Sequence, residues 1–449
     1  MSQPDQKIMM ELMERLWPLH RTLVSDDMDR AIEIIGEYLP EEHSYTTHEY
    51  PTGQKIWTWS VPEKYEVDKA YLEYLGPNGP ERIVDFADNP LHIVSYGPAF
   101  EGTLSWGELE SHLHTNPDRP KAIPWVFKFY DRDWGFCLPH DQYERLDRNG
   151  QYRAVMKTRY VDGTMKVGEL DIPGETDDYI LIVCAICHPC QVNDSISGVA
   201  VAVDYARRLT EHLKGKKPGP YGIKVLFLPE TVGSIAYLSN NEDLIERFKF
   251  GIFTEFVGHD DTLRFQRTRQ DDHRLDKVVR YAIDKITDGS FKEGPYCHTI
   301  ITNDEKVTNA PGVNIPTVAI NRWPGDNTDP SIIWPFYHTS DDKPSALNAA
   351  KLSEVSLIYD VMMEVLQKDF FPRRTYRGPL FLSGLEWEFD WKANRQLKQA
   401  TQNIMFHLEG DKSAFDIAAE VNLDFQVVLT VLNAMKKIGL IENSLEPWN

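Results

Sequence analysis

The strongest constraint on the fold is an alternation of apolar runs with amphipathic segments after about residue 152. The run YILIVCAIC at 179–187 is apolar at nearly every position, and IKVLFL at 223–228 repeats the pattern. Each is followed by a segment with helical spacing, SGVAVAVDYARRLTEHL and then SIAYLSNNEDLIERF. Strands without polar alternation suit a sheet covered on both faces. The alternation therefore predicts an α/β domain with a mixed, mainly parallel sheet and helices on both faces.

A chain of 449 residues exceeds what one hydrophobic core usually holds, so further domains are expected. Two other sequence patterns predict where they lie. Residues 46–147 carry short aromatic and β-branched runs such as KIWTWSV and WVFKFY between Gly, Pro and Asn, which predicts an inserted β-rich domain. Residues 1–45, with two expected helices, and 148–370 then form the α/β domain. Three helical periods and a short strand at 385–449 are typical of a winged helix.

The charge balance and the amino terminus narrow the classes of partner. Lys and Arg total 48 against 69 Asp and Glu, so the net charge of −21 disfavours nucleic acid and anionic membranes. The first twenty residues lack a secretory signal, and no run of 18 apolar residues predicts a transmembrane helix. The expected location is the cytoplasm.

Metal-competent side chains follow the predicted strands. His188 and Asp194 lie in the loop after the first apolar run, and Glu230 and Glu255 end the next two runs. His338 lies in a polar turn before another helix. Ligands of open α/β sheets bind at the carboxyl ends of the strands, and imidazole and carboxylate both bind zinc. The set predicts a metal site, although Glu230 could instead cap the next helix and His338 could hydrogen-bond its own turn.

Two cysteine-based sites compete with this interpretation. Cys184, Cys187 and His188 spell the C-x-x-C-H pattern of covalent haem attachment, and Cys190 adds a third thiol. Haem attachment belongs to exported proteins, and residues 184 and 187 of a strand face opposite ways. Buried cysteine is most often a small hydrophobe, so we favour neither site.

The same residues resemble the superfamily of zinc aminopeptidases, glutamate carboxypeptidases and glutaminyl cyclases. Phrases such as CHPCQVNDSISG, LPETVGSIAYLS and FYHTSDD look more closely like a bacterial branch with an aminopeptidase-like domain, often filed with polysaccharide biosynthesis genes, over nearly the whole chain. That branch carries an inserted β domain and a carboxyl-terminal winged helix. The matching motifs are His188, Asn193-Asp194 with Ser197-Gly198, Glu230 with Gly233-Ser234, Glu255, and His338-Thr339.

The resemblance implies roles for these residues. Zinc ligands would be His188, Asp194, His338 and Glu255, with Glu230 as the catalytic base. The superfamily has a second acid beside the base, whereas this chain has Thr231. One firmly bound zinc is therefore expected, with a second possible.

Two neighbouring acids are further candidates if Glu230 is itself a ligand. The base would then come from Glu255 or from the pair Asp304-Glu305, and Glu305 is a predicted catalytic residue. Asp304 or Glu305 could also bind a substrate amine, so Asp304 is predicted to bind substrate. A solvated acidic loop is the alternative for this pair.

The expected function is a zinc-dependent hydrolase of a peptide or small amide, aminopeptidase-like in mechanism. An acyltransferase or cyclase on the same scaffold is the alternative. A winged-helix regulator is a third, but residues 392–449 hold six Lys or Arg against seven Asp or Glu. Such a module suits packing against the catalytic domain or a second subunit better than phosphates. We expect a homo-oligomer without nucleic-acid or membrane partners.

Overall fold

The computed structural model describes residues 1–129, 131–296, 303–325, 332–380 and 395–448. The chain forms two compact units, Met1–Asp360 and Val361–Asn449, which we describe separately. The first unit contains the residues predicted to do chemistry.

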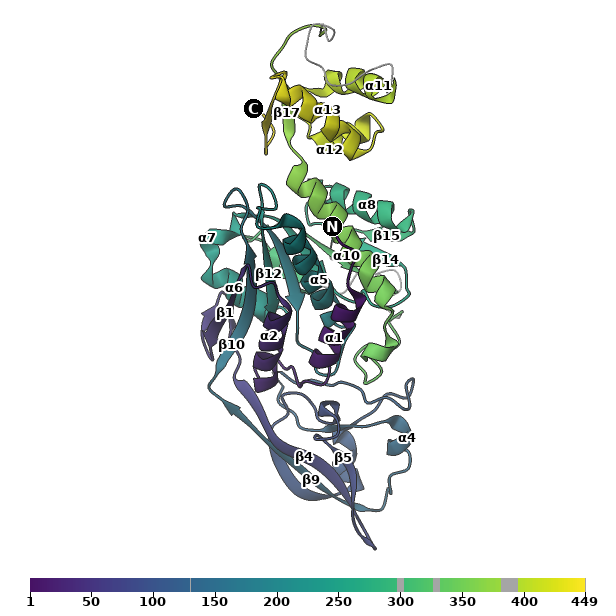
Figure 1. The fold of residues 1–449 in the computed structure, drawn as a ribbon. Coiled ribbons are helices and arrows are strands. Elements are labelled where there is room, and N and C mark those ends of the chain that lie inside the picture. Colours follow the sequence, from purple (N-terminus) through teal and green to yellow (C-terminus); the bar gives the residue numbers. More distant parts are fainter. Residues whose placement is uncertain (130, 297–302, 326–331, 381–394, 449) are drawn as a thin grey trace. The chain divides into compact units, whose positions relative to one another are not determined.

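A mixed eight-stranded sheet forms the centre of the first unit (Figure 1). Its four middle strands pair in parallel, and an antiparallel strand continues the sheet on each side. The two apolar runs are neighbouring middle strands and are buried at nearly every position, so the predicted α/β class is confirmed. In sheet order the strands are β1 (Ser44–Pro51), β10 (Thr164–Ile172), β12 (Gly222–Leu228), β11 (Tyr179–Ala185), β13 (Phe248–Thr254), β16 (Thr317–Asn321), β14 (Leu263–Gln266) and β15 (Phe291–Gly294).

Two helices open the chain, as the sequence predicts. Helix α1 (Gln6–Leu16) starts after Asp5, whose carboxylate accepts hydrogen bonds from the first-turn amides. Helix α2 (Asp26–Tyr38) starts after Ser25, whose hydroxyl accepts from the Met28 amide at 3.2 Å. Such caps satisfy amides that have no partner inside the helix.

A long helix follows β11 and packs through a buried ionic cluster. In α5 (Ile196–Leu213), the Arg208 guanidinium lies 2.8 Å from Asp204 and 2.7 Å from Asp360 of α10 (Ala349–Lys368). A buried cation is tolerated when carboxylates surround it. The other α-helices described in the first unit are α3 (Trp106–Leu109), α4 (His140–Tyr143), α6 (Val232–Asn240), α7 (Glu242–Ile245), α8 (Arg274–Thr287) and α9 (Asp304–Thr308).

A second, antiparallel sheet is inserted between β1 and β10 (Figure 1). Its strand β9 lies wholly after residue 147, from Gln151 to Val161, and the predicted domain boundaries stay predictions. In sheet order the strands are β5 (Gly79–Asp85), β4 (Lys64–Gly76), β9 (Gln151–Val161) and β6 (Phe100–Ser105). Smaller pairs are β2 (Lys55–Ile56) with β3 (Trp59–Ser60), and β7 (Leu113–His114) with β8 (Phe136–Cys137).

The second unit combines helices with an antiparallel pair of strands. Phe415 and Phe425 hold two of its helices together, with their ring centroids 5.7 Å apart. Winged-helix identity stays a prediction, and its predicted start at residue 385 lies outside the described residues. The elements are β17 (Phe371–Arg374), α11 (Arg395–Ile404), α12 (Ala414–Glu420), α13 (Phe425–Lys437) and β18 (Ile441–Ser444).

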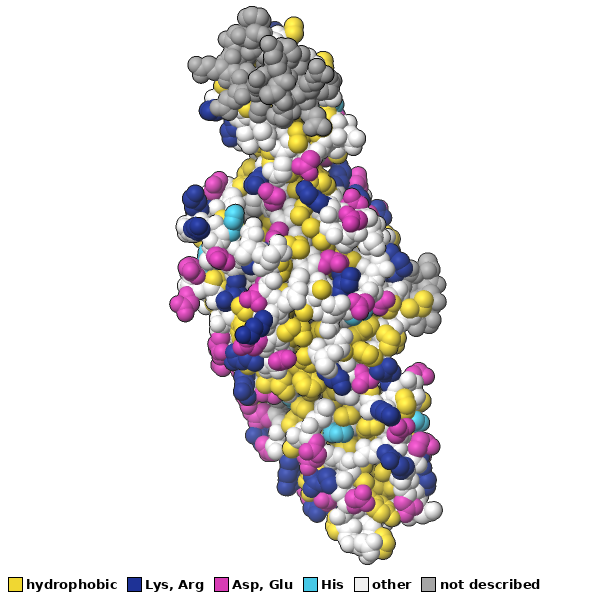
Figure 2. All heavy atoms as spheres, turned by 45° about the vertical axis from the view of Figure 1, so that its right-hand side comes forward, with side chains coloured by type: hydrophobic (Ala, Val, Ile, Leu, Met, Phe, Trp, Pro, Cys, Tyr) yellow, Lys and Arg dark blue, Asp and Glu magenta, His cyan; other side chains and the backbone are white. Residues whose placement is uncertain are grey.

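Charged side chains of both signs are interspersed on the face that Figure 2 shows. Among the described residues, neither sign forms a continuous strip on that face. Within the same residues, no helix is long and apolar enough to cross a membrane.

Gly198 allows α5 to approach β13 closely, which generates a stability prediction. A Cβ atom at this position would lie 1.7 Å from the carbonyl oxygen of Thr254, and backbone moves little. Gly198→Ala is therefore expected to lower the free energy of unfolding by about 3 kcal/mol, measured by urea denaturation. Gly107→Ala is the control, because nothing lies within 4 Å of its Cβ position. Equal denaturation midpoints for the two variants would contradict the close packing.

Candidate metal centre

The predicted ligands come together because three of the parallel strands end at one edge of the sheet. His188 follows β11, Glu230 follows β12 and Glu255 follows β13, and these strands are direct neighbours. Parallel strands place their carboxyl ends side by side, where ligands of α/β sheets bind. The sheet order thus converts three separate strand ends into one site.

His188, Asp194 and His338 converge most closely. Each offers one ligand atom, and all three atoms lie within 4.8 Å of one another. Asp194 Oδ2 lies 3.3 Å from His338 Nε2, and no described residue gives either buried atom a hydrogen bond. Burial alone would raise the pKa of Asp194, but His188, His338 and the Ser195 hydroxyl hold it below its ordinary value.

Glu230 lies beside this trio. Its Oε2 is 3.5 Å from His188 Nε2, and its amide donates a hydrogen bond to Cys187 Sγ at 3.3 Å. Burial, with added repulsion from Asp304 and Asp194, raises the pKa of Glu230 to about 7. A carboxyl group with that pKa can both accept and donate a proton at neutral pH.

Cys187 forms a second cluster with His188 and Glu230, again with ligand atoms within 4.8 Å. Burial raises the pKa of its thiol well above the ordinary value. Cys184 and Cys190 are also buried, and no metal-competent group found among the described residues includes either. A site of three thiolates therefore gains no support.

Glu255 is fully buried. Its Oε1 accepts a hydrogen bond from Asn303 Nδ2 at 2.7 Å, whereas no described residue hydrogen-bonds its Oε2. Burial, with repulsion from Asp194 and Glu230, raises its pKa well above the ordinary value. Glu255 is not in the group of three, so its role as a ligand stays a prediction.

Protein groups donate hydrogen bonds to one oxygen of Asp304 and to both oxygens of Glu305, whereas no described residue hydrogen-bonds Asp304 Oδ2. Asp304 accepts hydrogen bonds from the Thr231 amide at 2.9 Å and from Ser234 Oγ at 2.5 Å, so it holds the loop after β12. Glu305 accepts from Gln266 Nε2 at 3.2 Å and from the amide at residue 303. Both are fully buried, and burial raises the pKa of each to about 7. Their predicted roles in substrate binding and catalysis stay predictions.

A buried guanidinium fixes the loop that carries His188. Arg21 donates to the carbonyl oxygens of Ile186 at 2.7 Å, His188 at 2.8 Å and Gln191 at 2.9 Å. It also donates to the carbonyl of Leu16. Burial lowers the pKa of Arg21 to about 10, so the side chain stays charged at neutral pH.

A buried carboxyl group joins the other two ligand loops. Asp342, four residues after His338, accepts hydrogen bonds from the amides of Asn193 at 2.8 Å and Asp194 at 3.2 Å. The backbone at Asp194 is thus tied to the loop that carries His338. This contact explains how two ligands 144 positions apart in the chain hold one geometry.

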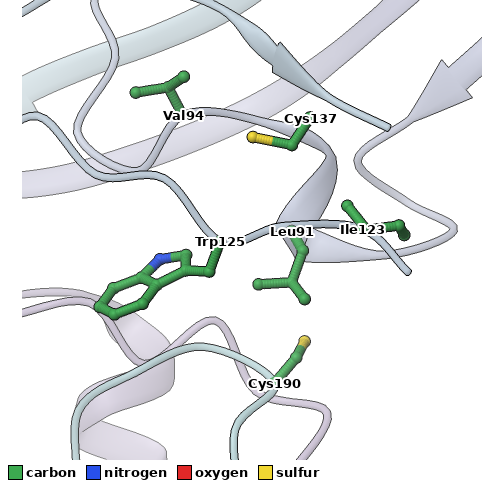
Figure 3. Packing of buried hydrophobic residues seen from close by; sticks show 6 residues of the cluster. All are labelled: Leu91, Val94, Ile123, Trp125, Cys137 and Cys190. Carbon is green, nitrogen blue, oxygen red and sulfur yellow. The ribbon is translucent and has the colours of Figure 1, made fainter. Parts of the chain in front are cut away.

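The inserted segment contributes an aromatic wall against both imidazoles. The Trp125 ring lies 4.4 Å from that of His188 and 4.6 Å from that of His338, centroid to centroid. Its amide donates to the His338 carbonyl at 2.7 Å. The indole belongs to a buried cluster that joins the inserted segment to the loop after His188 (Figure 3). The cluster consists of Leu91, Val94, Ile123, Trp125, Cys137 and Cys190.

A cavity of about 340 Å³ opens over these groups. Aromatic and aliphatic side chains form much of its wall, and Glu230 and Asp194 supply carboxyl groups. The described lining is Arg21, Thr22, Leu23, Trp59, Trp125, Phe127, Phe129, Cys187, His188, Asp194, Glu230, Thr231, Val232, Phe256, Asn303, Lys306, Tyr337 and His338.

Sequence reasoning missed Arg21, Trp125 and Asp342. Trp125 lies in the run WVFKFY, which indicated only a β-rich texture, and Asp342 lies in the quoted phrase FYHTSDD. Arg21 follows an amphipathic helix and carries no local signal. Only the contacts of these residues with distant loops assign them to the site.

Residues 10–369 match the family model described as "Domain of unknown function (DUF4910)". A relative from Clostridium acetobutylicum is 28% identical to this chain, and the match covers 96% of this chain and 95% of the relative. The relative is provisionally named as a polysaccharide biosynthesis protein with an aminopeptidase-like domain.

Solved structures agree on the fold. A Clostridium acetobutylicum protein provisionally described as a peptidase has a TM-score of 0.82 at 26% identity, with 98% of this chain and 96% of that chain covered. A zinc aminopeptidase from Bacillus subtilis has a TM-score of 0.57 at 14% identity, covering 81% of this chain and 95% of that chain. The α/β unit therefore has the zinc-aminopeptidase fold that the sequence predicted.

Arg21 provides a test of how the site is held. Arg21→Met would leave several buried carbonyl oxygens without their donor, so the free energy of unfolding is expected to fall by about 3 kcal/mol or more. Arg153→Met is the matched control, because Arg153 lies 3.7 Å from Glu101 on a half-exposed surface. The control is expected to lose about 0.5 kcal/mol or less in the same urea titration. Similar losses in both variants would remove Arg21 from this role.

Proposed function

This chain belongs to the family described as a domain of unknown function, DUF4910, and we propose that it is a zinc-dependent hydrolase of a peptide or small amide bond. The observation that carries the proposal is the convergence of His188, Asp194 and His338 beside Glu230 in one cavity. The fold shared with zinc aminopeptidases supports the same reaction class.

The donor atoms of the trio fit a zinc ion. Two imidazole nitrogens and one carboxylate oxygen form a common set for catalytic zinc, which leaves a coordination position for other ligands. Asp194 Oδ2 and His338 Nε2 are buried, lack hydrogen bonds from described residues, and so have capacity for a cation. Thr231 in place of a second acid favours one zinc per chain.

When bound, zinc supplies a Lewis acid for the amide carbonyl and makes a water molecule acidic, with a pKa of about 7. Glu230 accepts a proton from the attacking water and delivers it to the leaving amine. Its raised pKa suits this exchange. The Trp125 ring shields the two imidazoles from bulk water, which strengthens electrostatic interactions within the cavity.

The substrate class is an amide small enough for the cavity. Because the curated relative is named for polysaccharide biosynthesis, amides attached to sugars are candidates beside peptides. The buried carboxyl groups around the cavity disfavour an anionic group at the scissile bond.

Zinc content tests the ligand assignment. His188→Ala is expected to lower bound zinc from about one per chain to near zero after metal-replete purification, measured by elemental analysis. His212→Ala is the control, because this histidine is exposed near the end of α5, and it is expected to keep its zinc. A wild-type chain that binds no zinc would contradict the proposal.

Hydrolysis tests the role of Glu230. Glu230→Gln keeps the size of the side chain but removes the proton acceptor, so the rate is expected to fall by at least about 100-fold while zinc is retained. Mass spectrometry of short peptides and of N-acylated amino sugars identifies the reaction, because hydrolysis adds one water. Loss of ammonia or water would instead indicate cyclisation, and zinc loss in Glu230→Gln would make Glu230 a ligand.

A further inference from the structure

Three aromatic rings form a continuous strip along one wall of the cavity. Trp125, Phe127 and Phe129 occupy every second position of this part of the chain, and all three line the cavity. The ring centroids of Trp125 and Phe127 lie 4.7 Å apart, and those of Phe127 and Phe129 lie 4.8 Å apart. We call these three residues the aromatic strip.

Backbone hydrogen bonds fix the direction of the strip. The amide of Ser95 donates to the Val126 carbonyl at 2.9 Å, and the amide of Lys128 donates to the Ser95 carbonyl at 3.0 Å. The indole nitrogen of Trp125 also donates to Ser95 Oγ at 3.0 Å. Ser95 therefore fixes both the backbone of the strip and the position of the Trp125 ring.

The strip leads from the metal centre to solvent. Trp125 is buried against both imidazoles, whereas the Phe127 side chain is 41% exposed. Phe127 is still close to the centre, with its ring centroid 6.2 Å from that of His338. A single ligand can therefore stack one of its groups on Phe127 and place another beside the candidate metal ligands.

A second exposed ring lines the same cavity from another element. Trp59 belongs to the β2–β3 hairpin and is 38% exposed. The hairpin is held to the α/β region by Gln54, whose amide donates to Asn240 at 2.9 Å, and by Trp57, whose indole donates to Glu242 at 2.7 Å. Single exposed apolar side chains are ordinary, but two large rings in one cavity point to a ligand that covers them.

We infer that the aromatic strip and Trp59 form a subsite for a ring with an apolar face, carried by the substrate next to the amide. The ring is an aromatic side chain or a pyranose, which share that apolar face. Flat aromatic side chains bind ring faces by stacking and dispersion, and the contact strengthens binding by about two- to tenfold per ring. The inference rests on the proposed function, because it assigns the group attached to the cleaved amide.

Binding of three probes to the full-length protein tests the subsite by calorimetry. L-Phenylalaninol and D-glucosamine carry a ring, an amine and a hydroxyl, whereas L-alaninol carries the polar groups without a ring. None contains an amide, so turnover does not disturb the titration. At least one ring probe is expected to bind about tenfold more tightly than L-alaninol. A preference for L-phenylalaninol assigns an aromatic side chain, and a preference for D-glucosamine assigns a sugar.

Variants locate the ring preference. Phe127→Ala and Phe127→Leu are both expected to weaken binding of the ring probe by about two- to tenfold and to leave the affinity for L-alaninol unchanged. Trp59→Ala, on the separate hairpin, is also expected to weaken binding of the ring probe. Phe406→Ala is the matched control, because Phe406 is 84% exposed in the second unit, and it is expected to bind like the wild type.

The results separate this inference from the proposed function. Equal binding of all three probes, or a Phe127→Leu variant that binds the ring probe like the wild type, would overturn the subsite. Zinc-dependent hydrolysis could still be present in that case. Ring-selective binding by a chain that holds no zinc and cleaves no amide would support the subsite and reject the hydrolase.

Discussion

The burial of several carboxyl groups close together is the constraint on which the rest of the site depends. Asp194, Glu230, Glu255, Asp304 and Glu305 gather where the middle strands of the large sheet end, and four of them are fully buried. Carboxylates in such surroundings must bind protons, accept hydrogen bonds or lie next to a cation. Burial raises the pKa of four of these groups, and repulsion from neighbouring carboxyl groups adds to the rise for Glu230, Glu255 and Asp304. A divalent cation bound at the trio would offset the negative charge, and its binding would then also stabilise this region.

Contacts from distant segments hold the three ligand loops. The Arg21 guanidinium donates to the His188 carbonyl, and the Asp342 carboxylate accepts from the Asp194 amide. The Trp125 amide donates to the His338 carbonyl. These three residues come from the opening segment, the late loop and the inserted segment. The inserted β region is therefore part of the candidate metal centre, and it also supplies several of the aromatic rings that line the cavity.

Much of the α/β unit could be predicted because its signals are local. Runs such as YILIVCAIC are apolar throughout, and a chain that buries both faces of a strand needs that pattern. His188, Glu230 and Glu255 could be named because each follows such a run directly. Strand β9 shows the limit of this reasoning, because it pairs with β4 and β6 and nothing local in its residues 151–161 indicates which sheet they join. Asp304 shows another, because an acidic pair in a loop gives no sign that one carboxyl group will accept hydrogen bonds from the loop after β12.

By itself the sequence determined the fold class, the strand ends that carry the metal-competent side chains, and the absence of a second acid beside Glu230. Those features depend on spacing and on neighbours within a few residues. Only the tertiary structure decided which side chains converge, that Asp304 serves the loop at Thr231, and that Arg21 and Trp125 belong to the centre. Arg21 and His188, or Trp125 and His338, are more than 160 positions apart. Contacts over such separations depend on the order of the strands and on where an inserted segment folds back, and no local pattern encodes either.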